Sequence, residues 1–247
     1  MDNNSIMLSG VSDLYDLCEK RAEPVFSRFY DEAEQAMIKD NALLREGGFM
    51  FGGHTQCERK ILGVFPEWEE PDTEAYPIGI IKISHTFKKE LSHRDYLGSL
   101  MGLGIERDRT GDILVFEDYA YVFVHDSVKS YILNNLTKIG SLGVKVSEEK
   151  LSDFVYPERR TQALNVVAAS MRLDAVVSAA LNVSRSEASS LIGHERVSVN
   201  HRVRCDMSKK LSEGDLISVR GFGRYLVSSV GDETRKGRLH LTVLKYL

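Results

Sequence analysis

The last third of the chain, residues 171–247, constrains the fold more than any other part. Two short helical patterns follow one another there, and several short strand patterns come directly after them. Apolar residues repeat at helical spacing between Leu173 and Leu181. Ser184 stands three residues before Glu187, which is the spacing of a capping box at the start of a second helix. Together the patterns predict a small helix pair backed by a curled sheet.

Charge is distributed unevenly along the chain. Residues 171–247 contain 13 Lys and Arg against 8 Asp and Glu, a net charge of +5, whereas residues 1–170 contain 19 against 28, a net charge of −9. The total of −4 therefore conceals an acidic body and a basic C-terminal part. Such asymmetry indicates an anionic partner at the basic end. Bulk phosphate would repel the acidic part, which can orient the basic part toward it.

Arg185 occupies the first position of the second predicted helix. A cation there faces the positive end of the helix dipole, which costs about 0.3–1 kcal/mol, so folding alone gives no reason for an arginine. A phosphate bound from outside would reverse the sign, because the free N–H groups at the helix start and the guanidinium would both face it. Arg185 therefore predicts a phosphate site. The alternative is a solvated side chain that points away from the helix axis.

Further basic side chains stand at the ends of the predicted elements in the same module. Each alone is an ordinary solvated surface charge, but several of them can share one face. Phosphates of an RNA backbone would bind such a face with a strong dependence on salt. The candidates are Arg172, Arg196, Arg202, Arg204, Lys209 and Lys210. We therefore expect a single cationic surface suited to folded RNA.

The middle of the chain, residues 76–169, alternates between strand and helix patterns. The order is strand, helix, strand, strand, helix, strand, as in the ferredoxin-like unit. We expect Ser92 to cap the first of these helices, with Asp95 near its positive end. Asp126 is expected to cap the second helix and Gly140 to end it. The runs VKV, at 144–146, and QALNVVAA, at 162–169, are both expected to form strands after the second helix.

Three aromatic residues, Tyr119, Tyr121 and Phe123, alternate onto one face of a strand in this middle part. RNA-recognition motifs share the predicted topology and stack bases on aromatics of this strand. The basic and glycine-rich part of their usual signature is missing here. Aromatics at period two are also typical of a half-buried strand that packs on helices. The pattern favours core packing and leaves base stacking as the alternative.

The first 75 residues combine helical and strand patterns. A stripe that includes Val11 and Cys18 predicts a first helix, and a second is expected from Pro24 to about residue 46, with Gly47 as its stop. Two short strands follow. The expected fold class is α+β, with an N-terminal helical and β segment at 1–75, a ferredoxin-like (RNA-recognition-like) domain at 76–169 and a small RNA-binding domain at 170–247.

The C-terminal segment resembles the alpha-L RNA-binding fold, named after small-subunit ribosomal protein S-four. The matching residues are Arg172-Leu173-Asp174, SRSEASSLI from Ser184, VSVN from Val197 and LSEGDLISV from Leu211. The resemblance covers about a third of the chain. It adds Ser184 and Ser186 to the RNA-binding candidates.

The whole chain resembles the YlmH family, through SVRGFGR, from Ser218 to Arg224, and RDYLGSLMGLGIERDRTGDILV, from Arg94. The resemblance implies a ferredoxin-like domain before the alpha-L domain and adds Arg224 to the candidates. It also implies association with the large ribosomal subunit in ribosome-associated quality control, where peptidyl-tRNA is held, and a link to cell division. Relatives usually have glycine where Glu195 stands. Because left-handed backbone is costly for glutamate, we expect the helix to end earlier, at Gly193.

These patterns favour a non-catalytic, cytoplasmic RNA-binding protein that uses no cofactor, metal or membrane. Its expected partners are the large ribosomal subunit and ribosomal RNA, with direct contact to tRNA left open. Three widely spaced cysteines predict reduced thiols, and the start of the sequence lacks a secretory pattern. An RNA-modifying enzyme and a cell-division-linked adaptor are the alternatives.

Overall fold

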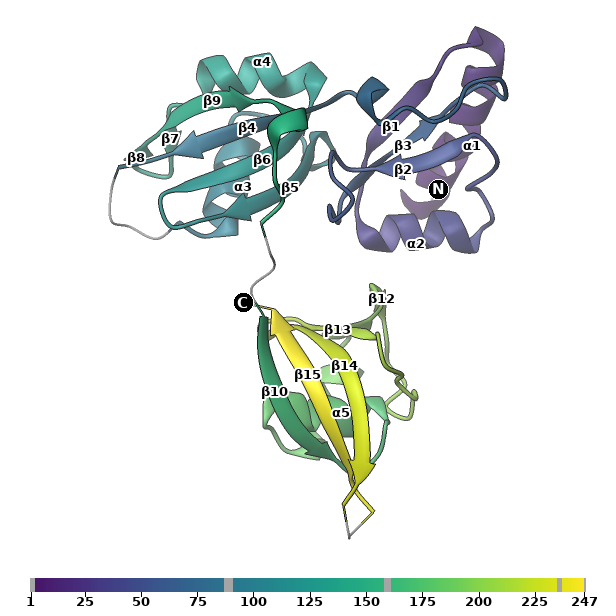
Figure 1. Cartoon of the computed structure of the whole chain (residues 1–247), viewed down its shortest axis with the longest axis vertical. Coiled ribbons are helices and arrows are strands. Elements are labelled where there is room, and N and C mark those ends of the chain that lie inside the picture. Colours follow the sequence, from purple (N-terminus) through teal and green to yellow (C-terminus); the bar gives the residue numbers. More distant parts are fainter. Residues whose placement is uncertain (1–2, 87–90, 158–160, 235–236, 247) are drawn as a thin grey trace. The chain divides into compact units, whose positions relative to one another are not determined.

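The computed structural model describes residues 3–86, 91–157, 161–234 and 237–246. The chain divides into two compact units, Met1–Tyr156 and Pro157–Leu247, which are described separately (Figure 1). The division falls earlier than the position near residue 169 where the charge and the sequence pattern change. Within the described ranges, no helix is long and apolar enough to cross a membrane.

The first part of the N-terminal unit is a small sheet covered by two helices. Its elements are α1 (Asn3–Arg21), β1 (Val25–Tyr30), α2 (Glu32–Asp40), β2 (Gly48–Phe51) and β3 (Lys60–Val64). Strand β3 lies between β1 and β2, and all three pair antiparallel. Val11, Ile38 and Leu62 come from the two helices and the sheet, and all three are fully buried in one core.

The predicted helix from Pro24 onward is wrong in its first part, because residues 25–30 form strand β1. Phe29 pairs with Ile61 of β3 and is fully buried. The hydroxyl of Ser27 accepts a hydrogen bond from the backbone N–H of Leu62 at 2.8 Å. Helix α2 begins only after Asp31, which caps it, and ends at Asp40. Pairing with β3 therefore outweighs the helical stripe in this segment.

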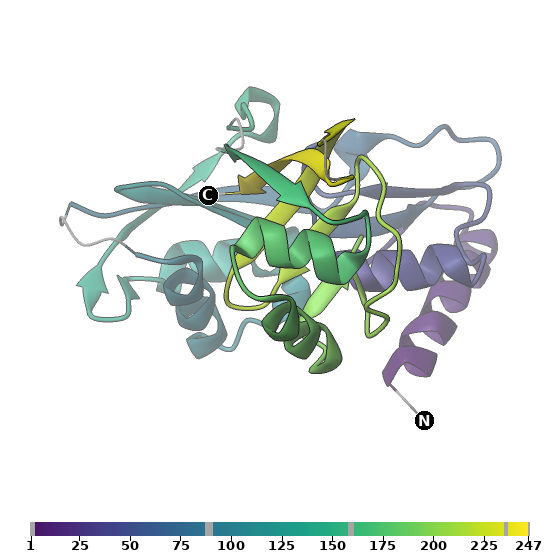
Figure 2. The same cartoon turned by 90° about the horizontal axis from the view of Figure 1, so that it is seen from below.

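The second part of the N-terminal unit is a four-stranded sheet with two helices. Its main elements are β4 (Ile78–Ser84), α3 (His93–Gly102), β5 (Thr110–Val115), β6 (Tyr119–His125), α4 (Asp126–Asn135) and β9 (Lys145–Glu149). Short elements flank them: η1 (Thr73–Ala75), η2 (Arg107–Arg109), β7 (Lys138–Ile139), β8 (Leu142–Gly143) and η3 (Leu151–Asp153). The strands are antiparallel in the order β5-β6-β4-β9. Helices α3 and α4 cover the same face of this sheet (Figure 2).

Of the two helices that cover this sheet, α3 has the predicted N-terminal cap and α4 does not. The backbone N–H of Ser92 donates to the Asp95 carboxylate at 2.8 Å, which confirms the cap of α3. In α4 the cap is His125, whose Nδ1 accepts the N–H of Ser127 at 3.1 Å. The prediction of Asp126 as the cap is wrong by one residue, because strand β6 runs up to the helix. Gly140 follows β7 rather than ending α4, which stops at Asn135.

The C-terminal unit is a helix pair on a six-stranded antiparallel sheet, as expected. Its elements are β10 (Thr161–Ala168), α5 (Leu173–Leu181), α6 (Arg185–Gly193), β11 (Val197–Val199), β12 (Arg202–Val203), β13 (Leu216–Val219), β14 (Gly223–Glu233) and β15 (Leu239–Tyr246). The strand order is β10-β15-β14-β13-β11-β12. Val176 of α5 and Ile192 of α6 share one buried core with Val227 and Val243 of the sheet.

Strand β10 forms where the sequence predicts a strand, but the assignment of residues 162–169 to the middle domain is wrong. Every residue of β10 pairs with β15, for example Leu164 with Val243. The outer place beside β4 in the four-stranded sheet is taken by β9, which overlaps the run VKV, at 144–146, that was also predicted to be a strand. The residues of β10 themselves predict a strand, but its partner strand is determined by packing between segments that lie some 80 residues apart in the sequence.

Candidate nucleic-acid interface

Arg185 lies at the start of α6, as predicted, but it has a partner within the fold. Ser184 caps the helix, and its hydroxyl accepts the N–H of Glu187 at 3.1 Å. The guanidinium of Arg185 forms an ion pair with the carboxylate of Asp174, in the first turn of α5. The inference that folding gives no reason for this arginine is therefore wrong, because Asp174 offsets the unfavourable helix dipole. Ser186 is exposed, with its hydroxyl 2.9 Å from that of Ser184.

A buried carboxylate holds two arginines together at this point. Asp174 is only 5 % exposed and also accepts from Arg172 Nε at 3.1 Å. Burial alone would raise the pKa of Asp174, but hydrogen bonds from Arg172 and Arg185 outweigh it and lower this pKa. The side chains of the two arginines remain 44 % and 54 % exposed, respectively. We call these three residues the Asp174 cluster; it carries a net charge of +1 and presents two oriented guanidiniums.

The predicted Lys209 and Lys210 lie beside this cluster through backbone contacts. The N–H of Leu173 donates to the carbonyl of Lys209 at 2.8 Å. Lys210 forms an isolated antiparallel bridge with Arg172. The backbone of the two lysines therefore lies beside the start of α5, where their positive charges add to those of the Asp174 cluster.

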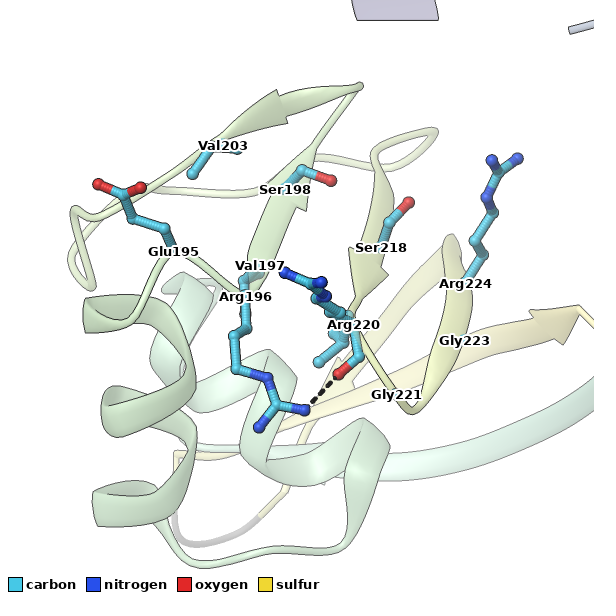
Figure 3. Close-up of a pocket in the computed structure, with 11 residues that line it drawn as sticks. Glu195, Arg196, Val197, Ser198, Val203, Ser218, Arg220, Gly221, Gly223 and Arg224 are labelled. Carbon is cyan, nitrogen blue, oxygen red and sulfur yellow. Dashed lines mark hydrogen bonds between the residues drawn. The ribbon is translucent and has the colours of Figure 1, made fainter. Parts of the chain in front are cut away.

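A second basic site lies elsewhere on the same unit. A hollow of about 390 Å³ is lined by three arginines, Arg196, Arg220 and Arg224, and by Ser198 and Ser218 (Figure 3). The backbone N–H of Arg220 donates to the carbonyl of Arg196 at 2.9 Å. In return, Nη2 of Arg196 donates to the carbonyl of Arg220 at 2.7 Å. We call this site the arginine hollow.

The turn between β13 and β14 forms one side of the hollow and depends on glycine. Gly221 has a φ of +90°, and a Cβ there would meet the guanidinium of Arg196 at 3.1 Å. Gly223 has a φ of +111°, a conformation that L side chains rarely adopt. This turn lies within SVRGFGR, but Arg220 is not among the RNA-binding residues predicted from the sequence. The two glycines of a hairpin turn directly after Arg220 were the signal available for finding it.

The predicted residues do not share one face. Arg196 and Arg224 line the arginine hollow, whereas Arg172 and Arg185 gather around Asp174. Val203 lines the hollow too, so strand alternation directs the neighbouring Arg202 to the opposite face of the sheet. Arg204 is half-buried, and its N–H donates to the carbonyl of Val197 at 3.0 Å. The expected single platform is therefore two separate basic groups.

The departure at Glu195 has a mixed outcome. Helix α6 ends at Gly193, as expected. Glu195 nevertheless adopts a left-handed conformation with a φ of +57°, in spite of the cost for a residue with a side chain. Glu195 lies across the arginine hollow from Arg220 and Arg224, on the side of Val203 (Figure 3).

The aromatic residues of β6 divide between core and sheet surface. Phe123 is fully buried and packs with Phe154 at a ring distance of 5.4 Å, so it is a core residue. Tyr119 and Tyr121 are half-buried. The ammonium group of Lys82 lies 4.6 Å from the centre of the Tyr119 ring, whose own plane stacks on Phe116. Existing contacts therefore already occupy these aromatic side chains.

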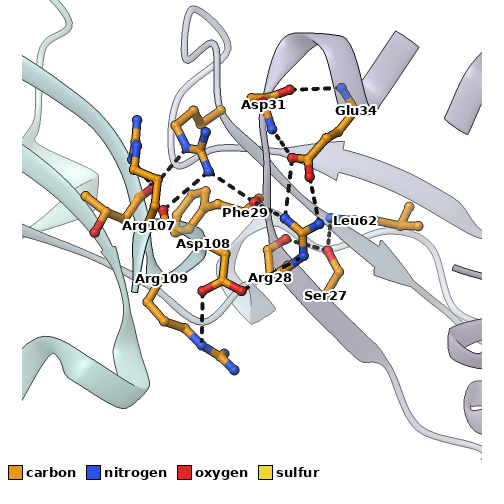
Figure 4. A network of polar contacts seen from close by, with 11 residues as sticks. Ser27, Arg28, Phe29, Asp31, Glu34, Leu62, Arg107, Asp108 and Arg109 are labelled. Carbon is orange, nitrogen blue, oxygen red and sulfur yellow. Dashed lines mark hydrogen bonds and ion pairs between the residues drawn. The ribbon is translucent and has the colours of Figure 1, made fainter. Parts of the chain in front are cut away.

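A further group of arginines, in the N-terminal unit, has a structural role (Figure 4). Arg59 donates to the carbonyls of Phe29, Arg107 and Thr110, at 3.2, 3.3 and 2.9 Å. Burial lowers the pKa of Arg107 to about 10 and also lowers that of Arg59. Because Arg59 points inward to backbone carbonyls, it joins the two sheets of this unit and is not placed to bind phosphate.

Comparison with known proteins identifies both parts of the chain. A family model described as "Putative RNA-binding domain in YlmH" matches residues 71–153, and the S4 domain model matches residues 171–217. The chain is 30 % identical over 216 residues to ribosome-associated protein quality control protein P2 of Bacillus subtilis (strain 168), covering 87 % of this chain and 84 % of that protein. The chain belongs to the YlmH family. A solved YlmH structure, the cell division protein from Streptococcus pneumoniae, is similar in fold, with a TM-score of 0.52 and 20 % identity over 63 % of this chain and 96 % of that one.

Proposed function

We propose that this YlmH protein binds RNA as a non-catalytic factor, with its S4 domain on ribosomal RNA or tRNA of the large ribosomal subunit. The observation that carries the proposal is the Asp174 cluster, in which a buried carboxylate orients two half-exposed arginine side chains at the starts of neighbouring helices. The name of the Bacillus subtilis relative supports a place in ribosome-associated quality control.

The physical case is that orientation reduces the cost of binding. Fixing two long arginine side chains normally costs side-chain entropy when they meet a ligand. In the cluster this cost is borne on folding, because Asp174 already holds Arg172 Nε at 3.1 Å and pairs with Arg185. The remaining guanidinium donors match the geometry of phosphate oxygens. Phosphates on adjacent parts of a folded RNA backbone are the ligands that fit.

The second part of the N-terminal unit, from β4 to β9, has the topology expected of an RNA-recognition-like domain. We propose that it is a ferredoxin-like domain, because an antiparallel sheet in the order β5-β6-β4-β9 with both helices on one face has that topology. The proposed organisation keeps an N-terminal part at 1–75 and this domain after it. Strand β10, residues 161–168, belongs with the S4 domain.

Co-sedimentation with large ribosomal subunits at increasing salt tests the proposal. We expect wild-type protein to pellet with large subunits and to be released as salt rises. Lys20→Gln removes an exposed cation at the end of α1, outside the S4 domain, and should be released from the subunits at the same salt concentration as wild type. Binding unaffected by salt, or no binding even at low salt, would contradict the proposal; the latter result would favour a protein-binding adaptor.

A further inference from the structure

The floor of the arginine hollow is a single row of side chains across four strands. Val203 of β12 pairs with Ser198 of β11, Ser198 with Ser218 of β13, and Ser218 with Arg224 of β14. Their neighbours Val197, Val199, Ile217 and Val219 are buried in the core. Because side chains alternate along a strand, the row lies on the face of the sheet directed away from that core. The hollow is therefore separate from the Asp174 cluster at the helix starts.

We propose that the arginine hollow binds one unpaired nucleotide of an RNA, an inference that rests on the proposed function and specifies its ligand. Its volume of about 390 Å³ falls at the small end of the range of roughly 300–1,000 Å³ for small-molecule sites. The guanidiniums of Arg220 and Arg224 supply the charge for a phosphate, and two serine hydroxyls can donate to or accept from a base edge. Bases splayed out of a helix are the elements that proteins hydrogen-bond and stack on arginine.

Charge within the hollow sets the direction in which the nucleotide enters. Glu195 lines one part of it and repels a phosphate, whereas Arg220 and Arg224 attract one. The phosphate therefore lies at the side of the β13–β14 turn, and the base lies over the serine row. Arg196 is a positioning residue, since its hydrogen bond to the carbonyl of Arg220, at 2.7 Å, holds the turn that carries Arg220.

The lining of the site favours an unpaired nucleotide over a duplex backbone, because serine hydroxyls stand beside the arginines. Phosphates of a duplex lie on a convex ridge, which meets exposed surface cations. The serine hydroxyls on the floor of the hollow can meet a base edge only when the base has left its helix. The Asp174 cluster is expected to contact backbone phosphates whether or not the bases of the RNA are paired. Substitutions in the two sites should therefore affect single-stranded and duplex RNA differently.

Fluorescence anisotropy with the full chain separates the two sites. The probes are a labelled six-nucleotide single strand of mixed sequence and a labelled twelve-base-pair RNA duplex. Arg220→Gln is expected to weaken binding of the single strand by roughly tenfold while leaving the duplex within about twofold of wild type. The matched control, Arg185→Gln, is expected to weaken both. Arg220→Lys keeps the charge without the planar fork and should recover only part of the single-strand affinity.

Each outcome decides between the claims. Equal loss for both RNAs in Arg220→Gln would make Arg220 an ordinary phosphate contact and overturn the hollow as a nucleotide site, as would unchanged binding. If wild-type protein binds the duplex but not the single strand, only the hollow proposal fails. If it binds neither RNA, the hollow proposal fails, and the proposed function fails as well if the protein also does not co-sediment with large subunits at low salt. Because the backbone carbonyl of Arg220 still accepts from Arg196 in the glutamine variant, the turn is retained, and a thermal unfolding midpoint like that of wild type verifies this.

Discussion

Substitution of Arg185 by glutamine tests the helix-start phosphate site most directly. Glutamate would be a poor choice, because it would place a second carboxylate beside the buried Asp174. That repulsion would raise the pKa of Asp174 and destabilise the domain, so lost binding could reflect unfolding. Glutamine removes the charge and leaves Asp174 its hydrogen bond from Arg172.

The structure sets the expected size of the effect. The Arg185 side chain is 54 % exposed, so its ion pair is screened by water and its loss should cost only about 0.5–1 kcal/mol of unfolding free energy. Loss of one phosphate contact should weaken RNA binding about tenfold at low salt. It should also make the slope of log affinity against log salt less negative by roughly 0.7–0.9.

Binding is measured by anisotropy with duplex RNA across a salt series, and stability by urea unfolding. Lys20→Gln provides the matched loss of one positive charge in the other unit of the chain. An Arg185→Gln protein with unchanged affinity and slope would refute a phosphate at this helix start. A change in affinity with no change in slope would show that the contact is not ionic.

Three further predictions concern stability and its dependence on pH. Glu195→Gly should raise the unfolding free energy measured in urea by about 0.5–1 kcal/mol, because relief of the left-handed φ of +57° outweighs the added freedom of the unfolded chain. Glu195→Gln keeps the strained backbone and should show no such gain. The pKa of Asp174 is lowered in the folded state, so its ionised form stabilises the fold above its unfolded pKa of about 3.9, and this stabilisation disappears as pH falls through the lowered pKa. The stability advantage of wild type over Asp174→Asn in thermal unfolding should therefore shrink below about pH 4, and an advantage that grows in acid would contradict the ion pairs. Asp112→Ala should lower the unfolding free energy by about 1–3 kcal/mol, because the backbone N–H groups of Glu58 and Arg59 lose their acceptor. The RNA affinity of this variant should stay unchanged. Reduced affinity in a fully folded variant would show that the region around Asp112 contacts RNA.

The elements that could not be predicted from the sequence are those set by contacts between distant segments. The strand at 161–168 was expected from its residues, but its pairing with β15 was not. Residues 25–30 carry a pattern compatible with a helix, and only β3 beside them selects a strand. The same limit hid the partner of Arg185, because Asp174 lies on the preceding helix and reaches Arg185 only when α5 and α6 pack together.

Features that depend only on neighbouring residues could be predicted from the amino-acid sequence. Ser184 and Ser92 begin helices, Gly193 ends one, and the basic charge collects in residues 171–247, because caps and net charge act within a turn or follow from composition. Tertiary structure alone decided that the arginines form two sites. Arg196 and Arg220 lie 24 residues apart and are joined by hydrogen bonds between the ends of β11 and β13. No local pattern encodes such a contact, since it exists only after packing of the core has chosen the order and register of the strands.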